Sequence, residues 1–147
     1  MQFKGEITIA APRDAVWAYV TDPVRVGRCG PGVDSIEVLG DDTFRAIAKV
    51  GIGLFRAKFT VDATFVERDA PNRAVIQARG NAPGSAVDAR ATMTLSDGAE
   101  PGTTLMEYGA DVLVGGAVAS AGARLLEGTA NKMIGQTFEC MRRSLEV

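Results

Sequence analysis

The stretch that decides the fold is residues 55–67, FRAKFTVDATFVE, whose side chains alternate between two chemical kinds. Lys58, Thr60, Asp62 and Thr64 are polar, and the residues between them are apolar. Because successive side chains of a β-strand point to opposite faces of a sheet, this pattern predicts a strand with one face in water. The predicted inward residues are Ala57, Phe59, Val61, Ala63 and Phe65.

Similar patterns extend in both directions from this strand. Strands are predicted at residues 3–9, 33–39, 43–50, 55–67, 73–80, 86–95 and 103–114. From residue 33 onward they are separated by short turns rich in Gly, Asp, Asn and Pro, which is typical of an antiparallel meander. Two short helices, after Pro12 and from Pro23 to about Arg28, follow the first strand.

A long helix is predicted at about residues 118–145, after Gly115 and Gly116. Its apolar stripe recurs every three or four residues, so one face should lie on the sheet. The fold class is therefore α+β, with a seven-stranded antiparallel sheet covered by the terminal helix. We expect one domain over residues 1–147.

Composition excludes several classes of function. Sixteen basic and eighteen acidic residues leave a net charge of −2, so there is no electrostatic footprint for nucleic acid. The chain contains no histidine, the commonest general base and metal ligand, so we expect no catalytic residues and no metal. No apolar run approaches the length of a membrane-spanning helix, and the N-terminus lacks a signal peptide. A cytoplasmic protein is expected.

The two cysteines, Cys29 and Cys140, are not expected to form a disulfide or a metal site, because they make no CxxC motif and no framework of several pairs. Cys29-Gly30-Pro31-Gly32 is interpreted as a helix stop with a semi-buried thiol.

The inward-facing residues of the predicted strands carry no charge, and about half of them are alanine. The start of the long helix is equally poor in bulky side chains. The space that such small side chains leave in the interior must close up, fill with water or hold a ligand. An apolar ligand in a cavity is therefore one hypothesis. The alternative is that small residues simply bring the helix closer to the sheet. The residues predicted to line the cavity are Trp17, Phe44, Ala46, Ala48, Val50, Phe55, Phe59, Val61, Ile76, Ala91, Met93, Met106, Tyr108, Ala121, Leu125, Leu126, Met133 and Thr137.

Two further features bear on this cavity. Tyr108, with Thr137 as a second candidate, could hydrogen-bond the head group of a ligand; a core tyrosine is the alternative. Residues Ile52, Leu54 and Phe55 lie at a predicted hairpin tip where polar residues are usual. This tip is interpreted as a lid over the cavity or as a contact for a membrane or a partner; plain packing is the alternative.

Five motifs resemble the CoxG family, the carbon monoxide dehydrogenase G-subunit proteins of the START/polyketide-cyclase-like (SRPBCC) superfamily. They span nearly the whole chain. The motifs are residues 11–17 (APRDAVW), 22–23 (DP), 29–32 (CGPG), 114–116 (VGG) and 124–130 (RLLEGTA).

The resemblance implies a helix-grip fold that encloses an apolar cavity. It also implies a role beside a molybdenum carbon monoxide dehydrogenase, or a related molybdenum hydroxylase, that links this enzyme to the membrane and the respiratory chain. A menaquinone, ubiquinone or other isoprenoid quinone in the cavity would serve that link, with no covalently bound cofactor. The expected location is the inner face of the cytoplasmic membrane. Family members often continue into a membrane-binding tail, whereas this sequence ends at Val147.

Three hypotheses remain open at this point. The first is a non-enzymatic carrier of a quinone. The second is a docking protein that recruits the dehydrogenase to the membrane and has an incidental cavity. The third is a cyclase or hydratase-like enzyme of the same superfamily, for which the predicted interior offers Tyr108 and few other polar groups.

Overall fold

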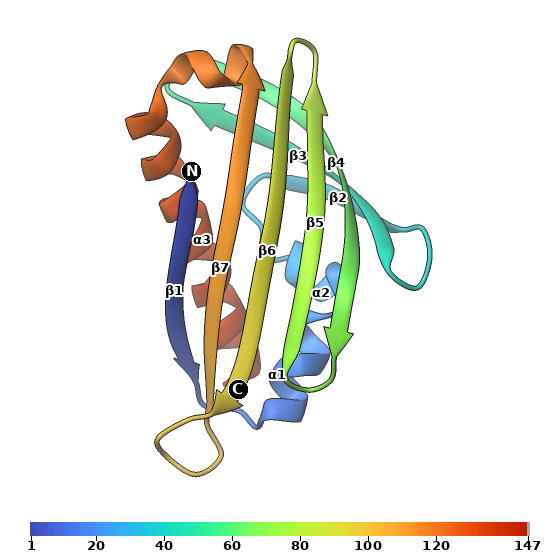
Figure 1. The fold of residues 1–147 in the computed structure, drawn as a ribbon, viewed down its shortest axis with the longest axis vertical. Coiled ribbons are helices and arrows are strands. Elements are labelled where there is room, and N and C mark those ends of the chain that lie inside the picture. Colours follow the sequence, from blue (N-terminus) through green and yellow to red (C-terminus); the bar gives the residue numbers. More distant parts are fainter. Residues whose placement is uncertain (147) are drawn as a thin grey trace.

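A computed structural model describes residues 1–146 of the protein; Val147, the last residue of the predicted domain, lies outside the described part. The chain begins with a strand, crosses two short helices, returns through six strands and ends in a long helix (Figure 1). The elements are β1 (Gln2–Ile9), α1 (Arg13–Val20), α2 (Pro23–Gly27), β2 (Val33–Val38), β3 (Thr43–Ile52), β4 (Phe55–Asp69), β5 (Arg73–Ala82), β6 (Ser85–Asp97), β7 (Thr104–Gly116), the 3₁₀-helix η1 (Ala117–Ala121) and α3 (Ala123–Leu145).

The strands of the described residues form one sheet of seven, in the order β1-β7-β6-β5-β4-β3-β2. Every neighbouring pair is antiparallel. Consecutive strands from β2 to β7 are joined by short turns, and α1 and α2 carry the chain from β1 at one edge to β2 at the other. The predicted fold class is confirmed.

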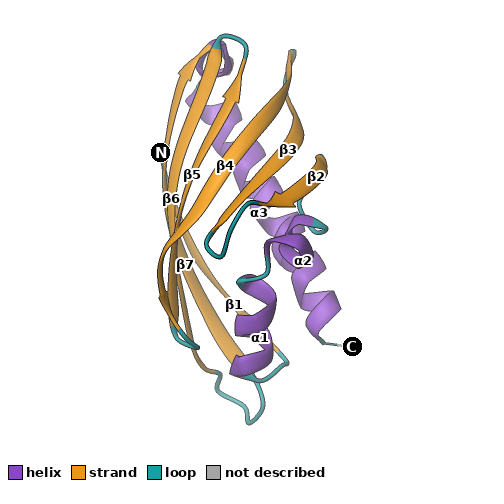
Figure 2. Ribbon diagram, turned by 90° about the vertical axis from the view of Figure 1, so that its right-hand side faces the viewer, coloured by secondary structure: helices purple, strands orange, loops and turns teal. Residues whose placement is uncertain are grey.

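The long helix lies across the concave side of the curved sheet (Figure 2). It begins at Ala123 and not at Val118 as predicted, because residues 117–121 form a 3₁₀-helix instead. Gly122 separates the two segments with φ of 91°, a backbone conformation in which an α-helix cannot continue. Among the described residues, no helix combines the length and apolarity needed to cross a membrane.

The core consists of two separate clusters of buried side chains. One includes Ile9, Val16 and Met141, and it lies where α1 and the end of α3 meet the sheet. The other includes Phe59, Val118 and Leu126, near the opposite end of the molecule. The interior is therefore filled at both ends.

The outer face of the sheet carries a row of alternating charges across neighbouring strands. Arg45, Asp62, Arg79 and Asp88 are consecutive partners in the strand register. Arg45 Nε donates a hydrogen bond to Asp62 at 2.7 Å, and this bond together with the carboxylate charge raises the pKa of Arg45. Like the predicted alternation, this row places the charged side chains on the water-facing side of the sheet.

The two cysteines form a disulfide, so the prediction that they would not is wrong. The Cα atoms of Cys29 and Cys140 lie 5.4 Å apart, although the residues are 111 positions apart in the sequence. The pairing arises because the last third of α3 returns past the segment that follows α2. This proximity depends on the complete fold, so the local sequence around each cysteine gives no sign of it.

Candidate functional site

A cavity of about 480 Å³ lies between the sheet, α2 and α3. It separates the two core clusters, since its walls include members of both, such as Met106 of one and Val61 of the other. No lining residue carries a charge. The size and the apolar walls are typical of a site for a small organic ligand.

The sheet supplies a wall of small side chains. Ile76, Ala91 and Ala110 are register partners on three adjacent strands, and all three line the cavity. Ala46 and Ala48 of β3 continue this wall toward the other edge of the sheet. These side chains are too short to reach the covering helices, so the space in front of them stays open.

The second wall comes from α2 and the loop after it. Pro23, Val26, Gly27 and Gly30 line the cavity and recur every three or four residues. At Gly27 a Cβ atom would lie only 2.5 Å from Cγ1 of Ile36, so the absence of a side chain lets α2 pack closely on β2. Asp22 caps this helix by accepting a hydrogen bond from the Val24 N–H at 3.0 Å. The sequence-based lining set missed this wall, although the spacing of its small and apolar residues was a usable signal.

The third wall is the apolar face of α3, which contributes Ile134, Thr137, Phe138 and Met141. The ring of Phe138 packs edge-on against the ring of Tyr108, with the ring centres 4.8 Å apart. Thr137 Oγ1 donates a hydrogen bond to the Met133 carbonyl oxygen at 2.8 Å. None of the hydrogen bonds found among residues 1–146 involves the Tyr108 hydroxyl. Tyr108 is thus a cavity-lining residue whose hydroxyl is not used in a hydrogen bond among residues 1–146.

Ten of the predicted lining residues line this cavity. They are Phe44, Ala46, Ala48, Val61, Ile76, Ala91, Met93, Met106, Tyr108 and Thr137. Nine of them lie on strands, where the inward phase is inferred from the outward-facing charged residues.

The other predicted lining residues lie elsewhere. Trp17 packs half-buried against the cluster that contains Ile9. Val50, Phe55, Phe59, Ala121 and Leu126 belong to the cluster that contains Val118. Leu125 is 44% exposed, and Met133 is half-buried outside the cavity. Most of these residues face inward as predicted but fill one end of the sheet, and alternation along a strand cannot distinguish a filled end from an open middle.

The three residues of the β3–β4 hairpin interpreted as a lid or as a contact for a membrane or a partner differ in exposure. Ile52 is buried and Phe55 is half-buried, so both pack into the core cluster at this end. Leu54 alone of the three projects fully into solvent. None of the three lines the cavity.

A second hollow, of about 410 Å³, lies on the outer face of the sheet. Charged side chains of Asp62, Arg79, Asp88, Arg90 and Asp111 surround it, and Leu113 stands at its edge. Within residues 1–146 no group of three or more Asp, Glu or Cys side chains is placed to hold a metal ion.

Residues 5–146 match the family model of the carbon monoxide dehydrogenase G subunit (CoxG). No curated protein shows a significant sequence match to the chain.

Solved structures share the fold at low sequence identity. A conserved protein from Geobacillus kaustophilus superposes with a TM-score of 0.91 at 24% identity, covering 99% of this chain and 95% of that chain. The ZhuI aromatase/cyclase from Streptomyces sp. R1128 superposes with a TM-score of 0.70 at 19% sequence identity, covering 99% of this chain and 93% of that chain. A START superfamily protein from Mycobacterium smegmatis superposes with a TM-score of 0.71 at 12% sequence identity, covering 99% of this chain and 97% of that chain. These similarities establish the helix-grip fold.

Proposed function

The chain belongs to the CoxG family of carbon monoxide dehydrogenase G-subunit proteins, and on this premise we propose that it is a non-enzymatic carrier of an isoprenoid quinone, menaquinone or ubiquinone. In this proposal the quinone occupies the cavity and passes electrons between a molybdenum carbon monoxide dehydrogenase and the respiratory chain at the inner face of the cytoplasmic membrane. The observation that carries the proposal is the uncharged cavity of about 480 Å³ between the two core clusters.

The walls favour an apolar occupant over water. Water in a cavity needs two to four polar partners, and most of the lining side chains here are aliphatic or aromatic. An empty space of this size forfeits the dispersion contacts of every residue around it. A ligand with a flat ring and a hydrocarbon chain would restore these contacts and bury its own apolar surface.

The polar group available for the ligand is the hydroxyl of Tyr108. A quinone carbonyl accepts hydrogen bonds, and the Tyr108 hydroxyl is a donor with no acceptor among the described residues. The Phe138 ring beside it offers an aromatic face or edge for a quinone ring. The cavity thus combines a potential donor with apolar walls, as a quinone head group requires.

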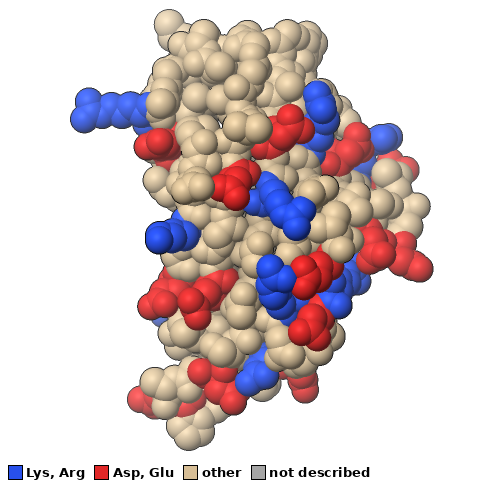
Figure 3. All heavy atoms as spheres, in the orientation of Figure 1, with Lys and Arg blue, Asp and Glu red and all other residues tan. Residues whose placement is uncertain are grey.

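The end of the molecule near the β3–β4 and β5–β6 hairpins suits contact with a membrane. Residues 50–55, 81–87 and 112–123 carry no charge, and on the face seen in the space-filling view the uppermost part of the molecule shows no charged atoms (Figure 3). The Ala117 N–H donates a hydrogen bond to the Gly84 carbonyl oxygen at 2.8 Å, which joins the two later segments. Leu54 is fully exposed here, and such a patch indicates an interaction site for an apolar surface.

The experiment that tests the proposal is to identify the molecule that co-purifies with the protein. Protein produced in a quinone-containing bacterium would be extracted with organic solvent, and the extract would be analysed by mass spectrometry. We expect an isoprenoid quinone in the wild-type extract. If no quinone is extracted and the protein also fails to bind added menaquinone, the carrier proposal is overturned.

A matched pair of variants on β3 separates cavity binding from surface binding. Ala48 lines the cavity, so Ala48→Phe should displace the quinone from the extract. Ile47 is adjacent but has the opposite parity, so its side chain lies on the outer face of the strand. Ile47→Phe should therefore retain the quinone. Loss of the quinone from both variants would place it outside the cavity.

A docking protein with an incidental cavity is the second candidate, and the charged hollow on the outer face of the sheet favours it. The two functions differ in what Ala48→Phe should do to a reconstituted system. If the protein only docks the dehydrogenase, the variant supports both complex formation and electron transfer to quinone. If it carries the quinone, the complex forms and electron transfer is lost.

A further inference from the structure

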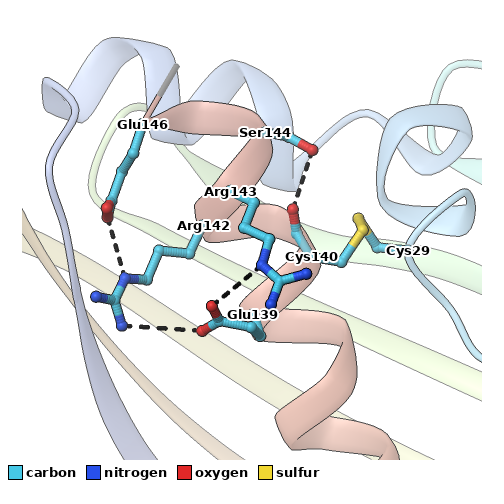
Figure 4. Close-up of polar contacts among 7 residues, drawn as sticks. All are labelled: Cys29, Glu139, Cys140, Arg142, Arg143, Ser144 and Glu146. Atoms are coloured by element: carbon cyan, nitrogen blue, oxygen red, sulfur yellow. Dashed lines mark hydrogen bonds and ion pairs between the residues drawn. A yellow bond between two sulfur atoms is a disulfide. The ribbon is translucent and has the colours of Figure 1, made fainter.

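The disulfide between Cys29 and Cys140 connects two walls of the cavity. Cys29 lies just after α2 and is 8% exposed, and Cys140 lies on α3 next to Met141 (Figure 4). Gly30 on one side of the bridge and Met141 on the other both line the cavity. Opening this bond would release one wall from the other without cutting either element.

The α2 wall has fewer buried contacts than the α3 wall, although Val26 packs against the cluster that contains Ile9 and Gly27 lets the helix pack closely on β2. This helix has five residues, none of them buried, and its main contacts are with β2 and α1 rather than with α3. The α3 wall is much better supported, because Leu126 and Met141 are buried in the two core clusters. If the bridge opened, α2 would therefore be the wall that moves, since segments with few buried contacts open at the lowest cost.

The surroundings of the sulfur atoms favour a cleavage in which a thiolate attacks Cys140 and Cys29 is the leaving group. Cys140 is partly buried, so an incoming thiolate can approach it more readily than the buried Cys29. The hydroxyl of Tyr19 lies 3.2 Å from Cys29 Sγ and is the donor of this hydrogen bond, because a disulfide sulfur carries no hydrogen; the same hydroxyl also donates to the Arg25 carbonyl oxygen at 3.4 Å. The guanidinium of Arg25 lies over the Tyr19 ring, 4.4 Å from its centre. The Tyr19 hydroxyl would stabilise a thiolate forming on Cys29 by donating this hydrogen bond, and a stabilised leaving thiolate departs faster.

We propose that the Cys29–Cys140 disulfide is a redox latch on the ligand cavity. The oxidised protein holds α2 against α3 and retains the ligand, and reduction lets α2 move so that the ligand exchanges. The latch rests on the proposed function as far as the ligand is concerned. In the cytoplasm, the location proposed above, disulfides are usually transient or redox-sensing rather than permanent.

The reductant in this scheme is a dithiol protein. Its first thiolate attacks Cys140 Sγ and forms a mixed disulfide, while Cys29 leaves as a thiolate and takes up a proton. Its second thiolate then attacks the mixed disulfide, so that Cys140 leaves and takes up a second proton. The reductant ends as a disulfide, and the latch has gained two electrons and two protons.

The first test measures the latch without any ligand. Hydrogen–deuterium exchange of the apo protein would be compared before and after reduction with tris(2-carboxyethyl)phosphine. At exchange times short enough that the amides of β5 and β6 stay protected in both redox states, we expect the amides of residues 23–32 to exchange roughly tenfold faster after reduction. Unchanged protection of residues 23–32 at these times would overturn the latch.

The second test measures ligand exchange with N-phenyl-1-naphthylamine, a redox-inert apolar fluorophore. Its dissociation from wild-type protein should become roughly tenfold faster on reduction. Cys140→Ser should match the reduced wild type with or without reductant. A probe that binds but leaves both wild-type forms at one rate would contradict the latch and spare the carrier proposal. A probe that does not enter the cavity would count against the carrier proposal, and the exchange experiment would still decide the latch.

Discussion

At the scale of single residues, Tyr108 owes its position to a glycine on the neighbouring strand. The register pairs Tyr108 with Gly5, and a Cβ atom at Gly5 would lie 2.6 Å from the Tyr108 hydroxyl oxygen. The ring can therefore lie over β1, where Phe138 of α3 packs against it. The parity of β7 predicted an inward side chain, but its hydroxyl is positioned by a residue more than a hundred positions away.

Replacing Tyr108 by phenylalanine should weaken quinone binding and leave the fold intact. The hydroxyl has no hydrogen-bond partner among the described residues, so its removal leaves no donor or acceptor of the protein without a partner. Loss of one hydrogen bond to the ligand of about 1 kcal/mol corresponds to a five- to tenfold rise in Kd. Titration with a short-chain menaquinone measures the Kd, and thermal unfolding checks stability. Equal affinity of the two proteins would show that the hydroxyl does not contact the ligand.

At the scale of secondary-structure elements, the junction before α3 sets how this helix enters the sheet. Gly122 turns the chain with φ of 91° and accepts the hydrogen bond that starts α3, from the Leu126 N–H at 3.0 Å. The helical periodicity of the sequence predicted one continuous helix across this junction. The structure has a 3₁₀-helix before Gly122 and an α-helix after it. A residue with positive φ leaves no mark in the pattern of apolar residues. Only the glycines on either side of residues 117–121, Gly116 and Gly122, hinted at the break.

Two glycine-to-alanine substitutions should change stability in opposite directions. Gly122→Ala places a Cβ in a left-handed conformation, which costs about 1–2 kcal/mol. Gly128 lies inside α3, and a Cβ atom added there would meet nothing within 4 Å, so Gly128→Ala should stabilise by about 0.5–1 kcal/mol. Urea unfolding of both variants measures the free energies. The same sign for both would contradict the assigned start of α3.

The β3–β4 hairpin makes a prediction about membrane contact. Leu54→Ser removes the fully exposed leucine from the uncharged end and should weaken liposome binding by roughly tenfold, the value of one buried leucine side chain. Leu39→Ser is the matched control, since Leu39 is 47% exposed but lies next to Asp41 and Asp42. Liposome co-sedimentation measures both. If Leu54→Ser binds liposomes as wild type does, the membrane contact lies elsewhere.

At the scale of the whole molecule, the disulfide closes most of the chain into one covalent loop. It links the segment after α2 to the last turns of α3, and both cysteines lie at the cluster that contains Ile9. Constraining a loop of this length in the unfolded chain is worth several kcal/mol. The bridge therefore affects global stability in addition to the mobility of α2.

Reduction should lower the free energy of unfolding by about 4 kcal/mol, because the unfolded chain regains the entropy of a loop of about a hundred residues. Urea unfolding with and without reductant measures this difference. The double variant Cys29→Ser with Cys140→Ser should have the stability of the reduced protein under both conditions. A wild-type protein equally stable with and without reductant would mean that the bridge is absent in solution.

The sequence by itself determined the order of elements, the antiparallel meander and the inward face of each strand. These features depend on side chains two to four positions apart, and local periodicity records them directly. It also indicated that bulk is missing from the interior.

The tertiary structure alone decided where this missing bulk becomes a cavity. Inward residues at one end, such as Phe59, are covered by Val118 and Leu126, whereas Ala91 in the middle faces open space. The wall formed by α2 and the pairing of Cys29 with Cys140 arise in the same way, from segments that meet only after the sheet has curved around α3. Contacts between distant segments leave no period in the sequence, and so they required the folded chain.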